Sequence, residues 1–158
     1  MMDIREAIPT EIDLLARLWY DGWQDAHASI LPAALAKVRT LSSFAERLQA
    51  NLADVRVAGQ QGAPIGLCIV KGDELNQLYV SAEARGTGVA AQLLADGEQR
   101  INANGAQRAW LACAIGNERA ARFYQKNGWQ CVGEQTIHLE TPEGEFPLEI
   151  WRYEKRVG

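Results

Sequence analysis

The chain has few residues of the kinds that bind metals or build disulfide frameworks. Its 158 residues include two histidines and three cysteines, with no C-x-x-C pair and no His/Cys cluster. No zinc-site signature is therefore present, and an odd number of widely spaced cysteines argues against a disulfide framework. Cys68, Cys113 and Cys131 each lie in an apolar, strand-like run, which predicts three buried thiols in a reducing cytoplasm.

Long apolar runs and blocks of positive charge are also absent. No run approaches the roughly 20 apolar residues that span a membrane, and Met1–Arg5 lacks the apolar core of a secretory signal peptide. We therefore expect a cytoplasmic protein without membrane contact. Sixteen basic and twenty acidic residues give a net charge of −4, which argues against general nucleic-acid binding. The length and a hydrophobic content of 47% favour a single globular domain over residues 1–158.

The spacing of apolar residues changes from a helical period to a strand-like period along the chain. A short strand at Ile4–Ala7 precedes a helical region that extends to Leu52 and is interrupted at Pro32, with Ser42 or Ser43 as the cap of its last piece. Later strands are expected around Val55–Val57 and at Ile65–Val70, Glu74–Val80, Arg108–Ala114, Cys131–Leu139 and Phe146–Tyr153. Helices are expected from the turn after Val80 to Asn104 and over Asn117–Asn127. This order predicts an α+β fold in which helices are layered on a sheet.

A glycine-rich turn, Arg85-Gly86-Thr87-Gly88, connects the strand ending at Val80 to the next helix. Its two glycines allow the backbone to approach a ligand closely, and the N–H groups of the first helical turn have no partners within the helix. The positive end of the helix dipole favours an anion there, and Arg85 adds a forked donor suited to phosphate. The turn predicts a phosphate-binding loop, with a plain strand-to-helix turn as the alternative.

Two other phosphate-binding motifs can be excluded for this turn. Gly86-x-Gly88-x-x-Ala91 fits a dinucleotide-binding fingerprint, but that motif follows the first strand of a βαβ unit and needs an acid about 20 residues later. Here an antiparallel meander precedes it, and Gln107–Ala109 contains no acid. No Gly-Lys-Ser/Thr follows the glycines, so the turn is not a P-loop.

A second motif extends from Asn117 to Trp129. Asn117 is a good N-cap, and Gly128 provides a left-handed helix stop. Phe123 and Tyr124 lie on the same side of the helix. Helix formation and packing explain most of this pattern, with Phe123 in the core and Tyr124 as a core tyrosine whose hydroxyl is satisfied.

Together the two motifs resemble those of the GCN5-related N-acetyltransferase (GNAT) superfamily. Arg85–Ala90 fits the acyl-CoA motif R/Q-x-x-G-x-G/A, and Asn117–Trp129 fits N-x-x-A-x-x-F-Y-x-K-x-G-F with Trp129 in place of the last Phe. They occur in order, about 30 residues apart, with a strand between them, and the resemblance extends from about Val55 to the C-terminus. It implies a GNAT-like, mostly antiparallel twisted sheet of about seven strands, splayed between strands 4 and 5 and flanked by helices.

The resemblance also implies acetyl-CoA as co-substrate, bound in the splay between Glu74–Val80 and Arg108–Ala114. The pantetheine arm would pair with the backbone of the first of these strands, and the pyrophosphate would lie on the glycine-rich loop. The implied cofactor-binding residues are Leu78, Tyr79, Val80, Arg85, Gly86, Thr87, Gly88, Val89, Ala90, Asn117 and Tyr124, with no metal. Asn117 keeps its helix-cap role as an equal alternative.

Within the resemblance, the implied catalytic residues are Tyr124 and Glu74. A phenol with a pKa of about 10 can protonate a departing thiolate whose conjugate acid has a pKa of about 8.5. Glu74 matches the position of the family's base and could act directly or through water, although a solvent-facing strand glutamate is the alternative. His138 is a rival proton acceptor, with a structural or exposed histidine as the alternative. A backbone N–H near Leu78 is expected to polarise the carbonyl group.

The acceptor pocket is expected from the first helices and the last strands, with Trp19, Tyr20, Trp23, His27 and the 140–149 segment. The two tryptophans could enclose an amine by cation–π contact, or one or both could be core. The expected activity is N-acetyl transfer to a primary amine of a small molecule or peptide by direct attack on the thioester. The alternative is a non-catalytic acyl-CoA-binding or regulatory protein. The exposed edge of the Phe146–Tyr153 hairpin is a possible homodimer contact.

Overall fold

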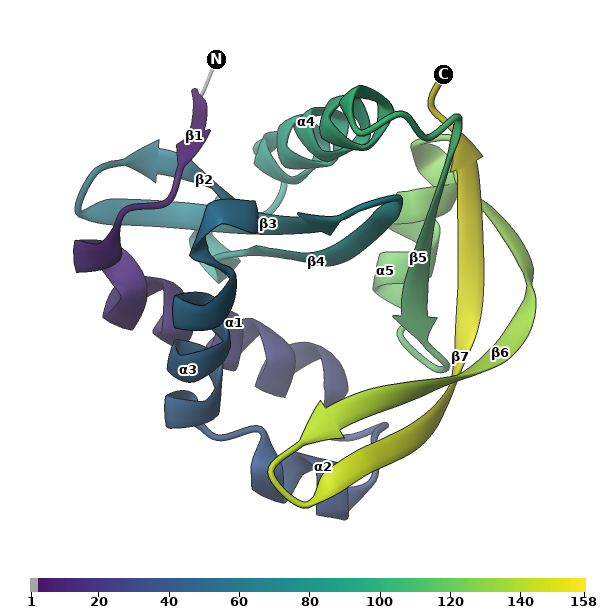
Figure 1. Ribbon diagram of the computed structural model, residues 1–158, viewed down its shortest axis with the longest axis horizontal. Coiled ribbons are helices and arrows are strands. Elements are labelled where there is room, and N and C mark those ends of the chain that lie inside the picture. The colour runs from purple at the N-terminus through teal and green to yellow at the C-terminus, as the bar shows by residue number, and fades with distance from the viewer. Residues whose placement is uncertain (1–2) are drawn as a thin grey trace.

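One sheet with helices on both faces forms the fold (Figure 1). The computed structural model describes residues 3–158. In chain order the elements are β1 (Ile4–Glu6), α1 (Ile12–His27), α2 (Ala33–Val38), α3 (Leu41–Asn51), β2 (Val55–Gln60), β3 (Ala63–Lys71), β4 (Glu74–Val80), α4 (Val89–Ala103), β5 (Arg108–Ala114), α5 (Glu118–Lys126), β6 (Gln130–Thr141) and β7 (Gly144–Arg156). No helix in this part of the chain is long and apolar enough to cross a membrane.

The sheet has seven strands in the order β1-β2-β3-β4-β5-β7-β6. All neighbouring strands are antiparallel except β4 and β5, which are parallel and share the single register pair Glu74–Trp110. Trp110 donates from its backbone N–H to the carbonyl of Asp73 at 3.1 Å, and the strands then run apart (Figure 1). The predicted α+β fold and the splay between strands 4 and 5 are therefore confirmed.

A β-bulge lies where β4 leaves β5. Ile69 of β3 pairs with Gln77, whereas the next residue, Val70, pairs with Leu75, so Asn76 is the extra residue. A bulge bends its strand and increases the local twist. Because the bulge follows directly after Glu74, it turns the rest of β4 away from β5.

Two hydrophobic cores cover the two faces of the sheet. One packs α4 and α5 on the sheet, and the other packs α1 and α3 on the opposite face. Glycines set the closest contacts: a Cβ at Gly97 of α4 would lie 2.6 Å from Leu75 Cδ1, and a Cβ at Gly22 of α1 would lie 2.6 Å from Tyr79 Cδ1. Both helices therefore approach β4 more closely than any larger residue would allow.

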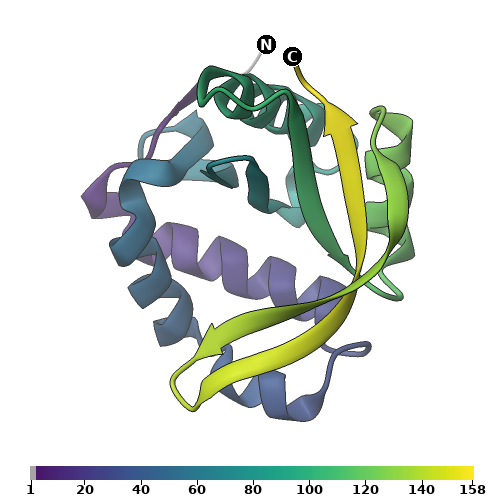
Figure 2. The ribbon, with the colours of Figure 1, turned by 45° about the vertical axis from the view of Figure 1, so that its right-hand side comes forward.

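The β6–β7 hairpin continues beyond the end of β5 and its tip lies beside α2 (Figure 1, Figure 2). A guanidinium N–H of Arg39, directly after α2, donates to the carbonyl oxygen of Glu140 at 3.2 Å. The hairpin strands are longer than predicted, because cross-strand pairing continues from Gln130–Glu154 to Thr141–Gly144. The free edge of the hairpin belongs to β6, since β7 lies between β5 and β6.

Two local predictions are wrong, and a third is right only in part. Thr40, and neither Ser42 nor Ser43, caps α3, because its hydroxyl accepts from the N–H of Ser43 at 3.2 Å. Cys131 is exposed, unlike the two buried cysteines, because it lies on the edge strand β6. Phe123 is half-buried and contributes to the wall of a cleft as well as to the core.

Candidate functional site

The backbone of β4 has a free side in the splay. Ser81 donates its N–H to the carbonyl of Ile65 at 2.8 Å, and along an antiparallel pair the hydrogen-bonding direction alternates with each residue. Tyr79 therefore directs its backbone groups to β3, while Leu78 and Val80 direct theirs to the opposite side. Beyond its one register pair with β5, no strand in the described part of the chain covers that side of β4.

A cleft of about 570 Å³, here called the outer cleft, runs along this side of β4 to the glycine-rich loop and α5. Nine of the eleven predicted cofactor-binding residues line it: Leu78, Tyr79, Val80, Arg85, Gly86, Gly88, Ala90, Asn117 and Tyr124. The side chains of Thr87 and Val89 lie elsewhere. The Thr87 hydroxyl donates to the carbonyl of Ala84, and Val89 is buried in the core under α4.

Two glycines give the loop its shape. Gly86 and Gly88 have φ angles of +79° and +88°, in the left-handed region that L-residues disfavour. Apart from the adjacent residues in the chain, no atom of residues 3–158 lies within 4 Å of a Cβ built on either residue. Gly88 is also the N-cap of α4 and has no side chain to cap the helix. The loop therefore presents bare backbone to open space at a helix N-terminus, as an anion site requires.

An ion-pair cluster spans the mouth of the outer cleft. The carboxylate of Asp25 on α1 accepts from Arg85 of the loop at 2.6 Å and from Arg119 of α5 at 3.2 Å. Hydrogen bonds from Arg85 and then from Arg119 hold the pKa of Asp25 below its usual value. The sequence did not indicate this cluster, because its members are 60 and 94 residues apart.

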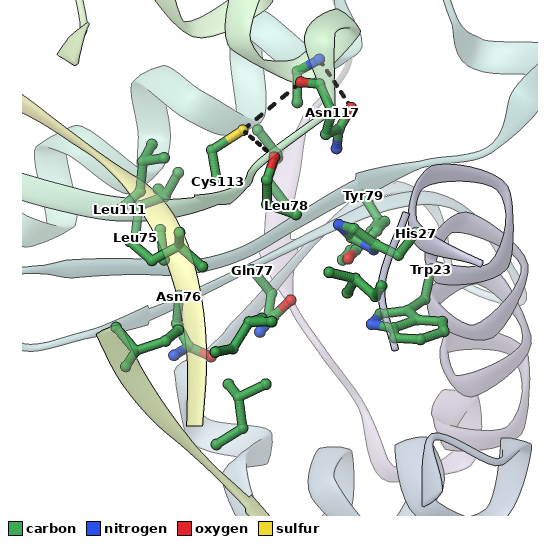
Figure 3. Close-up of a pocket in the computed structure, with 18 of the residues that line it drawn as sticks. Trp23, His27, Leu75, Asn76, Gln77, Leu78, Tyr79, Leu111, Cys113 and Asn117 are labelled. Carbon is green, nitrogen blue, oxygen red and sulfur yellow. Dashed lines mark hydrogen bonds between the residues drawn. The ribbon is translucent and has the colours of Figure 1, made fainter. Parts of the chain in front are cut away.

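A second, smaller cavity of about 180 Å³, here called the inner cavity, lies deeper in the splay. Its walls come from α1, α2, α3, α5, β4, β5 and the β6–β7 hairpin. Figure 3 shows Trp23 and His27 of α1 beside Tyr79 on one side, with Cys113 and Asn117 across from them. The hairpin and the helices thus enclose a space that the sheet alone would leave open.

The two cavities share five lining residues, Leu78, Tyr79, Asn117, Ala120 and Tyr124. These residues form the junction through which a group held in the outer cleft faces the inner cavity. The junction combines a backbone N–H directed into the splay with a phenol. It can therefore hold a reactive group between two binding spaces.

Tyr124 contributes both to the core and to the junction. Its ring packs against Phe123, Trp129 and Tyr153 with centroid distances of 5.4, 6.2 and 6.2 Å. Its hydroxyl has no hydrogen-bond partner within residues 3–158, unlike the satisfied core tyrosine considered from sequence. Burial raises the pKa of Tyr124 above its ordinary value, so the phenol stays protonated at neutral pH and can donate a proton.

Asn117 combines the two roles that the sequence left open. Its side-chain oxygen accepts from the N–H of Ala120 at 3.3 Å and so caps α5. The residue also lines both cavities. Capping uses only the oxygen, which leaves the side-chain NH₂ group as a donor at the junction.

Glu74 lies in the wall of the inner cavity, at the closed end of the splay. It is half-buried, and desolvation raises its pKa above the usual value. Leu78 is the fourth residue after Glu74, so their Cα atoms are about 13 Å apart along an extended strand at about 3.3 Å per residue. Its carboxylate can therefore serve the junction only through intervening water.

His138 does not contribute to either cavity. Side chains on a strand alternate between faces, and in β6 Ile137 and Leu139 line the inner cavity while His138 is exposed. The position of His138 therefore does not support its role as a proton acceptor. No group of three or more His, Cys, Asp or Glu residues in the described chain is arranged to hold a metal ion.

The predicted aromatic acceptor wall is correct only in part. Trp23 and His27 line the inner cavity, but Trp19 is buried in the core and Tyr20 does not line the cavity. The face of Trp19 is already covered by the guanidinium of Arg47, 4.4 Å from the ring centroid. Trp19 therefore has the core role that the sequence left open as the alternative to an amine contact, since the cation on its ring is the protein's own.

The sequence reasoning also missed two arginines in the wall of the inner cavity, Arg39 and Arg47. Both occur in a polar, helix-forming stretch, where an arginine is normally solvated. Nothing in the local pattern distinguishes them from exposed arginines. Only the packing of the hairpin and α1 over this stretch places them inside.

Similarity to known proteins identifies the family of this chain. The model of the Acetyltransferase (GNAT) family matches residues 12–129, which is well over half of the chain. The chain belongs to this family. GNAT relatives include an uncharacterized N-acetyltransferase of Mycobacterium tuberculosis, 34% identical over 117 residues that make up 71% of this chain and 72% of the relative.

Solved structures share the GNAT fold. A GCN5-related N-acetyltransferase of Rhodopseudomonas palustris superposes with a TM-score of 0.76 at 22% identity, covering 99% of this chain and 96% of the other. The PaiA N-acetyltransferase of Thermoplasma acidophilum, solved in complex with coenzyme A, gives 0.68 at 20% identity and covers 99% of both chains. At these identities the likeness establishes the fold alone.

The half-buried His27 predicts a loss of stability in mild acid. Burial lowers the pKa of His27 from 6.5 to about 4, so the unfolded chain takes up a proton at a higher pH than the folded protein. The contribution is fully present above pH 6.5 and is lost as the pH falls toward 4. Its size is at most about 3 kcal/mol at 1.36 kcal/mol per pKa unit.

Urea unfolding at pH 7.5 and 4.5 measures this effect. His27→Gln should reduce the stability difference between the two pH values relative to the wild type, because the titrating group is gone. His138→Gln, which removes the exposed histidine, is the matched control and should leave the difference unchanged. Equal pH dependence in wild type and His27→Gln would show that His27 is not the titrating group.

Proposed function

We propose that the protein is an acetyl-CoA-dependent N-acetyltransferase that transfers an acetyl group to a primary amine of a small molecule or peptide. The observation that carries this proposal is the junction, where the free side of β4 and the Tyr124 phenol face both cavities. Family membership supports acetyl transfer. The coenzyme A bound to the PaiA protein supports the choice of donor.

The residues of the outer cleft fit coenzyme A. The free backbone of Leu78 and Val80 can pair with the amide groups of a pantetheine arm as an added strand would. The open backbone of Gly86 and Gly88 at the start of α4 suits a pyrophosphate, and Arg85 supplies a cationic fork. This assignment places the acyl end at the junction and the phosphates at the mouth.

The residues at the junction have the chemistry that acyl transfer needs. Acetyl-CoA supplies the acetyl group as an activated thioester. The N–H of Leu78 is positioned to polarise the carbonyl group. As the amine nitrogen bonds to the carbonyl carbon and the C–S bond breaks, Tyr124 donates its proton to the departing sulfur. Glu74 accepts the proton of the amine through water, and its raised pKa improves it as a base.

Tyr124→Phe tests the proposed chemistry. Wild-type protein should release coenzyme A from acetyl-CoA in the presence of at least one amine from a broad panel, measured with a thiol reagent and confirmed by mass spectrometry of the product. The variant should lose about 100-fold in kcat, the usual scale for a general acid, with little change in the acetyl-CoA Kd.

Tyr153→Phe is the control for the loss of a hydroxyl group beside the same aromatic cluster. Tyr153 is buried and lines neither cavity, so its variant should keep wild-type turnover. Wild-type turnover in Tyr124→Phe would remove Tyr124 from the mechanism. Tight acetyl-CoA binding without transfer to any amine would favour the non-catalytic acyl-CoA-binding alternative.

Gly88→Val tests the loop. A β-branched residue at φ +88° strains the backbone and places methyl groups in the open space over the loop. We expect the Kd for coenzyme A, measured by calorimetry, to rise at least tenfold, about 1.4 kcal/mol. Gly105→Val is the matched control at the opposite end of α4, with φ +95° and equally open space. It should lose similar stability but keep the wild-type Kd, and equal Kd values in both variants would reject the phosphate loop.

Asp25→Asn tests the ion pairs at the mouth of the outer cleft. The Asp25 carboxylate competes with bound phosphate for Arg85 and Arg119, so its neutralisation should tighten coenzyme A binding by about two- to fivefold at low salt. Because the pairs are exposed, stability should change by less than about 1 kcal/mol. Asp21→Asn, one turn earlier on α1, removes an exposed ion pair to Arg17 and should leave the Kd unchanged. Weaker binding in Asp25→Asn would contradict competition.

A further inference from the structure

Two cationic side chains in the inner cavity have no carboxylate partner. Arg39 is 4% exposed, and one of its guanidinium nitrogens donates to the carbonyl of Glu140. The guanidinium of Arg47 lies over the rings of Trp19 and Phe44, at 4.4 and 5.6 Å from the centroids. Within residues 3–158, neither arginine forms an ion pair with Asp or Glu.

This arrangement contrasts with the way the fold treats another buried charge. Glu11 is 2% exposed, and both terminal nitrogens of Arg5 bind its carboxylate at 2.8 and 2.7 Å. The chain has 20 acidic residues and 16 basic ones, so it does not lack carboxylates. A buried charge without a counterion costs several kcal/mol, so the buried Arg39 is exceptional, and the half-buried Arg47 in the same cavity also has no counterion within residues 3–158.

The arginines also repel each other and remain charged. Burial, and then the charge of Arg39, lower the pKa of Arg47 to about 10. Both side chains are therefore cationic at neutral pH. An anionic group placed between them would relieve the repulsion and supply the missing counterion.

The position of the arginines brings them close to the junction. Arg39 and Arg47 line the same inner cavity as Tyr79, and Tyr79 also lines the outer cleft. The inner cavity, at about 180 Å³, is smaller than the roughly 300 Å³ at the lower end of drug-sized pockets. An anion bound by the arginines would thus belong to a compact molecule that also reaches the junction.

We propose that the acceptor is a small amine that also carries a carboxylate, which Arg39 and Arg47 bind while the amine faces the junction. The guanidinium fork matches a carboxylate in geometry and charge. Glu74 is the only carboxylate among the residues that line the cavity, and it adds a site that favours an ammonium group. The cavity therefore suits a zwitterion. The acetylation of this acceptor rests on the proposed function, whereas binding of its carboxylate does not.

Matched ligands test this proposal. The probes are the common amino acids and ω-amino acids of three to six carbons, each paired with its carboxamide, which keeps the size and removes the negative charge. Binding to the coenzyme A-loaded protein is measured by calorimetry, and transfer from acetyl-CoA by coenzyme A release. We expect at least one carboxylate to bind and to react at least tenfold better in kcat/KM than its carboxamide.

Arginine variants show whether the cavity residues cause this preference. Arg39→Gln and Arg47→Gln should each reduce binding and kcat/KM for the carboxylate at least tenfold, change the carboxamide much less, and leave the coenzyme A Kd unchanged. Arg47→Lys keeps the charge without the fork and should retain part of the preference. Arg17→Gln is the control, because Arg17 is an exposed arginine that also lies over an aromatic ring and lines neither cavity. Thermal unfolding identifies any variant that fails to fold.

The outcomes separate this proposal from the proposed function. Arginine-dependent binding of a carboxylate without acetylation would support the anion site and reject the acetylation. Acetylation of amines with no preference for carboxylate over carboxamide would support the function and overturn the anion site. Absence of binding for every carboxylate would also overturn it. Stronger arginine-dependent binding of an aminoalkyl phosphonate than of its carboxylate counterpart would overturn the assignment of carboxylate in favour of phosphate.

Discussion

β4 and β5 share one residue pair, Glu74 and Trp110, and the features of the site follow from their divergence after it. The bulge at Asn76 bends β4 away at this point. Beyond it, Leu78 and Val80 direct their backbone groups to a side of β4 without a strand partner among the described residues, and the space between the strands becomes two connected cavities. A fully paired parallel sheet would have neither the free N–H of Leu78 nor room for a ligand.

Charged groups lie at the two ends of the splay, with neutral groups between them. At the outer end, the glycine-rich loop, Arg85 and Arg119 present positive groups at a helix N-terminus, and Asp25 holds both arginines in the absence of a ligand. At the inner end, Arg39 and Arg47 are enclosed by α1 and the β6–β7 hairpin. The junction between them is formed by neutral groups, so a reaction there is flanked by two regions that attract anions.

Sequence reasoning worked best where function depends on local backbone. The bounds of β4 and β5 agree with prediction at both ends, because alternation and turn residues mark short strands well. The loop from Arg85 to Gly88 could be recognised from sequence because its glycines adopt backbone conformations that other residues disfavour. The sequence left the roles of Trp19 and His138 open, because these depend on which neighbour covers a ring or which face of a hairpin turns inward. Sequence reasoning missed Asp25 and the cavity arginines, which act through distant partners.

The sequence by itself determined the family, the order of helices and strands and the position of the glycine-rich loop, because periodicity, caps and glycine positions are encoded within a few neighbouring residues. Only the tertiary structure decided which side chains share a cavity. The splay, the close approach of α1 at Gly22 and the reach of the hairpin to α2 bring together residues far apart in the chain. Burial and the absence of a counterion are properties of that assembly. The role proposed for Arg39 and Arg47 therefore follows from the tertiary structure and not from the sequence.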